Sequence, residues 1–449
     1  MQRTSRLYQS TTRDPIGPEN EGETVIRRTS VRLAVGVAIA LLAAGCGDSS
    51  ASKGTSSSPP TTSSASASGA STTAQATTVP AGNKATGAPV TIGWVNVDNS
   101  PSGSFPEMTK GVQTALSYVN NELGGWNGHP IKLDTCNPDS SAGASTNCSN
   151  QLVADHVPLV LTGVDAGSGG GVPVLLAANI PNVTSVPLGA AALTSANVFA
   201  LAGGGVANIP AIANYITGTL HAKKVVALVT DNPSALGSVN SFAGPVYKAA
   251  GTDFQVIAVP AATADFGPIW AQAASGKPDF IMAVFGSDAC LKLMQSRQSI
   301  GITIPTAYTE SCASDTILKS AASSADNAYF TGTTLLTKDP NDADVATYVR
   351  ASKQYSPADS LGGYHQLGFA QIMNTYAVLK TITGPDLTPA AVTSAFKGAV
   401  KVPGFMTHSF TCDGTVNSTF KPICNASVRI LQQKNGVLTD VLNAWIPAG

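Results

Sequence analysis

The sequence predicts an α/β fold built on doubly wound parallel sheets, and two observations lead to this prediction. From residue 90 onward, short runs rich in β-branched residues alternate with stretches in which apolar residues recur at helical spacing. This alternation is typical of parallel sheets whose strands are connected by covering helices. The chain has 449 residues, of which 43% are hydrophobic, so it can bury the cores of two or three domains.

The individual elements follow in order along the chain. The first helix carries Val112, Leu116 and Val119 at helical spacing. The pair Gly124-Gly125 is expected to end it, because glycine favours the position just after a helix. The other expected elements are helices at residues 172–178, 209–220, 289–300 and 368–381, and strands at residues 91–97, 131–135, 159–162, 183–186, 225–230, 254–259, 280–285 and 304–308.

Composition and charge exclude two classes of function. Lys+Arg number 26 against Asp+Glu 27, and the net charge is -1 without any basic block. Nucleic-acid binding needs clustered Lys and Arg for phosphate contacts, so we expect no nucleic-acid partner. The five histidines are scattered and no Cys-x-x-Cys occurs, so we also expect no metal site and no cofactor.

The N-terminus has the pattern of an export signal. Arg32 and two earlier arginines precede an apolar run at residues 33–44, which is too short to span a bilayer. The small residues that follow, ending at Cys46, resemble the lipobox of bacterial lipoproteins, although the leucine lies four residues before the cysteine instead of three. The resemblance implies a signal peptide at residues 1–45, lipidation of Cys46 and anchoring to the outer face of the bacterial cytoplasmic membrane. The alternative is an ordinary signal peptide cleaved near Ala44.

A polar linker follows the lipidation site. Residues 46–89 consist mostly of Ser, Thr, Ala, Gly and Pro, with very few charges. Such a segment buries too little apolar surface to offset its ordering entropy, so we expect it to be a disordered tether. The folded region would then be displayed at a membrane surface, in an oxidising compartment.

The cysteine count agrees with export. Of the seven cysteines, Cys46 is assigned to the lipid and six remain, for which fifteen pairings exist. The simplest pairing is consecutive, and each bridge would close a short loop worth roughly 3 kcal/mol in the chain-entropy model. The predicted bridges are Cys136–Cys148, Cys290–Cys312 and Cys412–Cys424.

One connection carries a resemblance to a known family. The strand at residues 90–93, the loop at 101–103 and the helix-Gly-Gly-x-x-Gly-x-x-Ile connection over residues 121–133 resemble the type I periplasmic binding proteins. The nearest subgroup is the leucine/isoleucine/valine-binding proteins, which are substrate-binding lipoproteins of ABC transporters. The resemblance extends from about residue 90 to the C-terminus and also covers Asp134-Thr135-Cys136.

The resemblance implies two lobes that close around a solute on three hinge crossovers. We place these crossovers near residues 203–208, 331–338 and 402–405. The expected lobes are residues 90–204 plus 336–401, and residues 205–335 plus 402–449.

The resemblance also implies ligand contacts in the first lobe. Gly167, Ser168 and Gly169 precede a helix, and in the family this loop holds the ligand carboxylate. Backbone N–H groups at a helix N-terminus favour an anion on physical grounds as well. Gly189 and Ala190 follow the next strand and are expected to support the same carboxylate.

The second lobe offers acidic residues that could bind the positively charged end of the ligand. Leu236 stands where the family often has an aromatic residue, and Asp288 and Glu310 each follow an expected strand. Their cysteine neighbours, Cys290 and Cys312, would tie the two acidic loops together. In the family an acidic residue at the place of Glu310 accepts the ligand's ammonium group, which would be costly to bury unpaired.

These features predict a monomeric solute-binding lipoprotein, not an enzyme. It would capture a small amino acid, or a related amine- or amide-bearing solute, and deliver it to ABC permease subunits in the membrane. Two alternatives remain at this point. One is a ligand-sensing domain of the same fold that signals to a membrane partner, and the other is a secreted serine hydrolase using Ser168.

Overall fold

The computed structural model describes residues 83–447, apart from Ser102 and Pro340. Every described residue belongs to the second of the chain's two units, residues 76–449. The expected signal peptide, Cys46 and most of the linker therefore lie outside the described residues. Within the described part, no helix combines the length and apolar character that crossing a bilayer requires.

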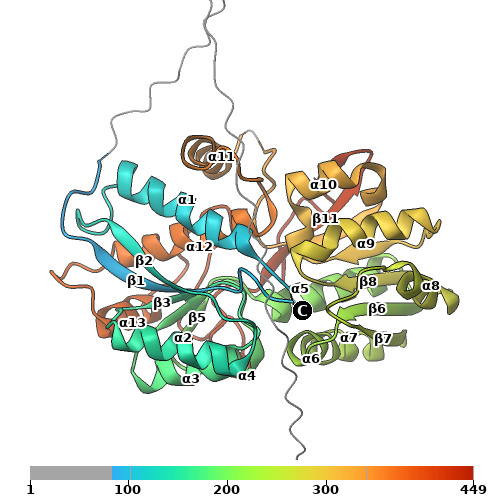
Figure 1. Ribbon diagram of the computed structural model, residues 1–449, viewed down its shortest axis with the longest axis horizontal. Helices are drawn as coiled ribbons and strands as arrows, with labels where there is room; N and C mark the ends of the chain where they lie inside the picture. The colour runs from blue at the N-terminus through green and yellow to red at the C-terminus, as the bar shows by residue number, and fades with distance from the viewer. Residues whose placement is uncertain (1–82, 102, 340, 448–449) are drawn as a thin grey trace, which may run out of the picture. The chain divides into compact units, whose positions relative to one another are not determined.

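The second unit contains two separate sheets, which we use to define a first and a second lobe (Figure 1). The first sheet has five parallel strands in the order β2-β1-β3-β4-β5. β1 lies in the interior of this sheet. Glycine fits at position 93 of β1 because a Cβ there would crowd the side chains of Val160 and Leu152. The strands are β1 (Val90–Val95), β2 (Ile131–Cys136), β3 (Val160–Thr162), β4 (Asn182–Thr184) and β5 (Val198–Ala200).

Helices from two distant parts of the chain cover the first sheet. At Gly111 and Gly368, a Cβ would collide with backbone oxygens of the opposite helix, so these glycines let α1 and α12 pack closely. Gly124 and Gly125 adopt φ of 84° and 62° directly after α1, which confirms the predicted helix end. The helices of this lobe are α1 (Pro106–Glu122), α2 (Ala142–Ala154), α3 (Ser168–Ala177), α4 (Gly189–Thr194), α11 (Ala343–Tyr355), α12 (Gly363–Leu379) and α13 (Pro389–Lys397).

The second sheet has eight strands and is mixed. Its path runs β12-β11-β10-β9-β8-β6-β7, and β13 pairs with β11 beside this path. The strands from β6 to β10 are parallel, whereas β11, β12 and β13 are antiparallel additions from the C-terminal segment. The strands are β6 (Lys224–Thr230), β7 (Asp253–Val259), β8 (Phe280–Val284), β9 (Thr306–Tyr308), β10 (Ala328–Gly332), β11 (Ser427–Lys434), β12 (Val437–Asp440) and β13 (Ile446–Pro447).

The helices of the second lobe complete the predicted α/β class, which the structure confirms. A π-helix at Tyr215–Thr219 continues α5, and 3-10 turns occupy Glu310–Ala313 and Ala322–Ala325. The α-helices are α5 (Gly204–Asn214), α6 (Pro233–Phe242), α7 (Gly244–Ala249), α8 (Gly267–Ser275), α9 (Ser287–Ser299) and α10 (Asp315–Ala321).

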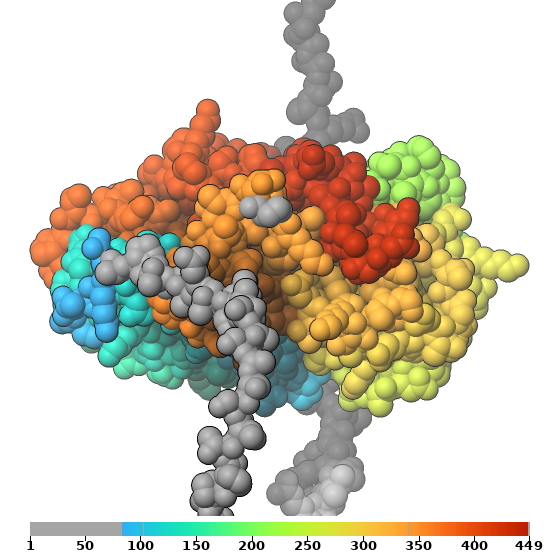
Figure 2. Space-filling view, turned by 90° about the horizontal axis from the view of Figure 1, so that it is seen from above, coloured from blue at the N-terminus to red at the C-terminus, as the bar shows by residue number. Residues whose placement is uncertain are grey.

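One passage of the chain between the two lobes lies at residues 335–336. Leu335 packs on the core of the first lobe and Leu336 on a core of the second. Figure 2 shows the two lobes from above. The orange segment, which includes α12, lies at the same end as the teal segment of α1, and the yellow segment lies at the opposite end. The orange and teal segments are far apart in sequence and share one core.

The third passage comes later in the chain than the expected residues 402–405. Met406 and Phe410 are buried in the first core, and the chain joins the second sheet only at Ser427. The reason is pairing at the edge of β5, where Ala200 N donates to Pro422 O and Cys424 N donates to Ala200 O, both at 2.8 Å. Residues 406–424 therefore pack mainly with the first lobe, although the ring of Phe420 also contacts that of Phe242 on α6 of the second.

The structure contains the three expected disulfides. Cys136–Cys148 joins β2 to α2, and Cys290–Cys312 joins α9 to the turn after β9. Cys412–Cys424 closes the loop that runs beside β5. Each bridge lies within one lobe, so none of them prevents the lobes from moving relative to each other.

Candidate ligand-binding site

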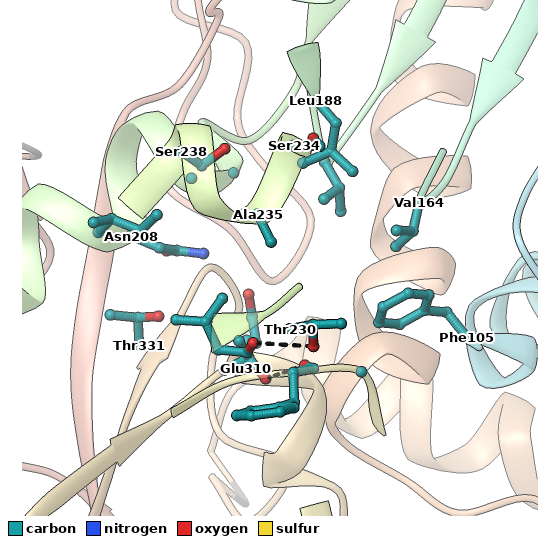
Figure 3. A pocket seen from close by; sticks show the side chains of 18 of the residues that line it. Phe105, Val164, Leu188, Asn208, Thr230, Ser234, Ala235, Ser238, Glu310 and Thr331 are labelled. Carbon is teal, nitrogen blue, oxygen red and sulfur yellow. Dashed lines mark hydrogen bonds between the residues drawn. The ribbon is translucent and has the colours of Figure 1, made fainter. Parts of the chain in front are cut away.

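A cavity of about 180 Å³ lies beyond the carboxyl ends of strands from both sheets (Figure 3). This is where open α/β sheets bind ligands. Phe105, Val164 and Leu188 line it from the first lobe, together with Tyr364 and Leu367 of α12. The second lobe contributes polar and apolar groups, among them Asn208, Ile209, Thr230, Ser234, Ala235, Ser238, Phe285, Thr309, Glu310 and Thr331.

Glu310 is the carboxylate of this cavity. It follows β9 and is only 5% exposed. Its Oε1 accepts hydrogen bonds from Thr333 N at 2.7 Å and Thr333 Oγ1 at 2.9 Å, and its Oε2 accepts from the same hydroxyl at 2.9 Å. Burial raises the pKa of Glu310 to about 7, although the hydrogen bonds from Thr333 oppose the rise. A proton or a cation from outside the protein would therefore stabilise the Glu310 carboxylate.

The charge of Glu310 has no cationic partner around the cavity. None of the described residues that line it is Lys, Arg or His. Burial raises the pKa of the Tyr364 hydroxyl, and the nearby carboxylates of Glu310 and Glu107 raise it further. The ring of Tyr364 lies 5.5 Å from that of Phe105, centroid to centroid, and forms an aromatic wall.

The two lobes also touch beside the cavity. Ser287 Oγ, at the start of α9, donates to Ser104 O at 2.9 Å. Glu107 lies near this contact, and its pKa is raised by burial first and then by the nearby carboxylates of Asp288 and Asp98. This contact joins the first lobe to the second and would have to break for the cleft to open.

The glycine loop predicted to hold a carboxylate lies behind the cavity wall. Gly167, Ser168 and Gly169 form the start of α3 and are not among the lining residues. Ser168 Oγ donates its hydrogen to Leu188 O, so this hydroxyl is already used within the lobe. The lining positions nearest to this loop are Val164 and Ala166.

The remaining predicted residues are near the cavity without lining it. Gly189 and Ala190 begin α4, whereas Leu188 just before them lines the cavity. Leu236 packs on a core of the second lobe, and its neighbour Ala235 faces the cavity instead. Asp288 lines an adjacent cavity that also contains Pro260 to Ala264 and Lys292. Of the predicted ligand residues, the structure thus brings Glu310 to this cavity.

Several lining residues were not expected from the sequence. Asn208 lies on α5, and Ser234 lies on the first turn of α6. Tyr364 and Leu367 come from α12, which is far away in sequence. The asparagine-capped start of α6 was a usable signal for Ser234, but no local pattern marks the other three.

Comparison with known proteins places this arrangement in a family. A family model described as periplasmic binding protein matches residues 89–422. The chain belongs to this family. It has the type I periplasmic binding protein fold, as the sequence resemblance implied. No curated protein matches the chain in sequence.

Solved structures with this fold bind different solutes. A leucine-binding protein, LivK, from Thermotoga maritima is 15% identical, with a TM-score of 0.66 over 80% of this chain and 99% of that one. LivJ from Streptococcus pneumoniae, solved with isoleucine, is 17% identical, with a TM-score of 0.64 over 80% and 99%. A solute-binding protein from R. palustris, solved with 4-hydroxybenzoate, is 14% identical, with a TM-score of 0.66 over 80% and 96%. The shared fold therefore leaves the solute of this chain open.

Proposed function

We propose that this chain is an exported lipoprotein that captures a small amino acid, or a related amine- or amide-bearing solute, for an ABC importer. The observation that carries the proposal is the buried Glu310 carboxylate in a cavity whose described lining residues include no cation. A buried carboxylate without a counter-ion is costly, so a solute that brings an ammonium or amide N–H gains a charge-assisted hydrogen bond there.

The apolar part of the solute would face the first lobe. Phe105, Val164 and Leu188 present hydrocarbon to the cavity on that side (Figure 3). Burying apolar surface there contributes about 25 cal/mol per Å² removed from water. Because the solute would touch both lobes, it stabilises their closed arrangement, and the closed protein would be the form that the permease subunits recognise.

The two alternative functions have less support from the site. A serine hydrolase needs Ser168 to be activated by a base, but its hydroxyl donates to the carbonyl of Leu188. Incubation with a fluorophosphonate probe tests this directly, since we expect no labelling. A sensing domain would use the same cavity and differ only in its partner, so co-purification with permease subunits rather than a signalling protein separates the two.

Isothermal calorimetry with a solute identified by native mass spectrometry tests the proposal. Glu310→Gln should weaken binding of an amine by about 2–5 kcal/mol, because the cation loses its charged partner. The matched control is Asp288→Asn, which makes the same acid-to-amide change in the adjacent cavity and should bind normally. Equal affinity of wild type and Glu310→Gln would reject Glu310 as the anchor.

A further inference from the structure

We propose that Asn208, Ser238 and Thr331 form a second polar subsite of the cavity, where they donate hydrogen bonds to an oxygen atom of the solute. This inference rests on the proposed function and deepens it. The solute would carry an oxygen-bearing group, namely a hydroxyl, a carboxamide or a carboxylate, close to the nitrogen that meets Glu310. The second lobe would then hold both polar groups of the solute.

The three residues come from elements of the second lobe that pack together. Asn208 lies on α5, Ser238 on α6 and Thr331 on β10, and all three line the cavity. α5 packs against both α6 and β10. A Cβ at Gly205, one turn before Asn208, would lie 3.7 Å from the Cβ of Ser238. The three side chains lie on the opposite side of the cavity from Phe105 (Figure 3).

The hydrogen-bonding groups of these side chains are unused within the described part of the chain. Neither atom of the Asn208 amide has a partner there, and its Oδ1 is buried. The hydroxyls of Ser238 and Thr331 also have no partner among the described residues, although Thr331 is only 5% exposed. Because buried polar groups in native proteins nearly always have a partner, three such side chains beside one cavity indicate a place for a polar group of the solute.

Closure of the cleft makes these donors selective. Water satisfies such groups in an open cleft, and a solute that displaces the water has to replace its hydrogen bonds. A solute oxygen can accept from Nδ2 of Asn208 and from the hydroxyls of Ser238 and Thr331. A hydrocarbon group at the same place would leave them unpaired, and sites of this kind discriminate strongly against an analogue that lacks the matching polar group.

The subsite lies beside the Glu310 carboxylate. Thr333 donates to this carboxylate through its N–H and its hydroxyl, and it follows Thr331 by two residues. Two residues of chain span at most about 7 Å, so one small molecule can reach both places. Glu310 would accept from the nitrogen of the solute and the subsite would donate to its oxygen. The apolar body is left to pack on Phe105 and Leu188 of the first lobe.

Calorimetry with matched probes tests the inference. 3-Methylbutylamine, L-leucinol, L-leucinamide and L-leucine share an amine and an apolar body, and the last three add a hydroxyl, a carboxamide or a carboxylate beside the amine. 2-Phenylethylamine, phenylalaninol, phenylalaninamide and phenylalanine form a second series. In at least one series we expect an oxygen-bearing probe to bind about tenfold more tightly than the plain amine, or better. If both plain amines bind as tightly as their oxygen-bearing partners, this inference is overturned and the proposed function stands. Absence of binding by every probe counts against both.

Asn208→Leu, Thr331→Val and Ser238→Ala test which side chains hold the oxygen. Each removes hydrogen-bonding atoms with little change in volume. The advantage of the oxygen-bearing probe should fall by about fivefold or more, while the affinity for the plain amine changes by less than about twofold. Ser241→Ala is the matched control, since it makes the same change at an exposed position of α6, and it should leave the advantage intact.

Thermal unfolding establishes that each variant is folded. The ratio of the two affinities, measured in the same variant, is also independent of any general loss of competent protein. An advantage that survives in all three cavity variants places the oxygen elsewhere in the cavity and overturns the assignment.

Discussion

Glu310→Gln should make the solute-free protein more stable at neutral pH while it weakens binding. The wild-type carboxyl is buried, and its pKa rises from 4.5 to about 7 on folding because of that burial. The amide of glutamine has nearly the same shape and can still accept the hydrogen bond from Thr333 N, which is now 2.7 Å from Oε1. The substitution therefore removes the charge and leaves the packing.

The magnitude follows from the difference between the two pKa values. Since the folded state binds the proton more tightly than the unfolded state, the free energy of unfolding of the wild type falls as the pH rises from about 4.5 to about 7. The total loss is ~3 kcal/mol, at 1.36 kcal/mol for each pKa unit. In Glu310→Gln this loss is absent, so the variant should gain up to about that amount relative to wild type across the same interval.

Urea denaturation of both proteins at a series of pH values, without solute, measures the effect. The difference in unfolding free energy between variant and wild type should grow with pH up to about 7 and then stay constant. A difference that is independent of pH would show that Glu310 is ionised in the folded protein as easily as in the unfolded chain. The account of a charge held in a cavity without a counter-ion would then be wrong.

Other predictions concern the support of the site and its motion. Thr333→Val removes the two hydrogen bonds that the Thr333 hydroxyl donates to Glu310 and keeps the one from the backbone N–H. It should weaken amine binding at neutral pH by about 1–3 kcal/mol, as calorimetry can measure; unchanged affinity would contradict it. Replacing both Cys290 and Cys312 by alanine should lower the unfolding free energy by roughly 3 kcal/mol, which chemical denaturation tests. A saturating solute should lower the radius of gyration measured by small-angle scattering, and no compaction would count against closure.

Local sequence patterns predicted much of the scaffold. The Gly124-Gly125 pair ended α1 as expected, because a glycine signal acts within a few residues. The strand before Glu310 was also expected, which placed this carboxylate at the carboxyl end of a parallel sheet. β10 and β11 were missed; β11 mixes polar and apolar residues in a pattern that only its neighbours explain.

The sequence by itself determined the α/β class, the family and the position of the acidic residue beyond β9, because periodicity, glycine signals and short motifs are local properties. Only the tertiary structure decided that the glycine run at the start of α3 packs closely against α2, which lies elsewhere in the chain. It also decided that residues 406–424 pack mainly with the first lobe. The cavity is lined by residues from both lobes that are far apart in the sequence. Its balance of polar and apolar groups therefore cannot be read from any short stretch of the chain.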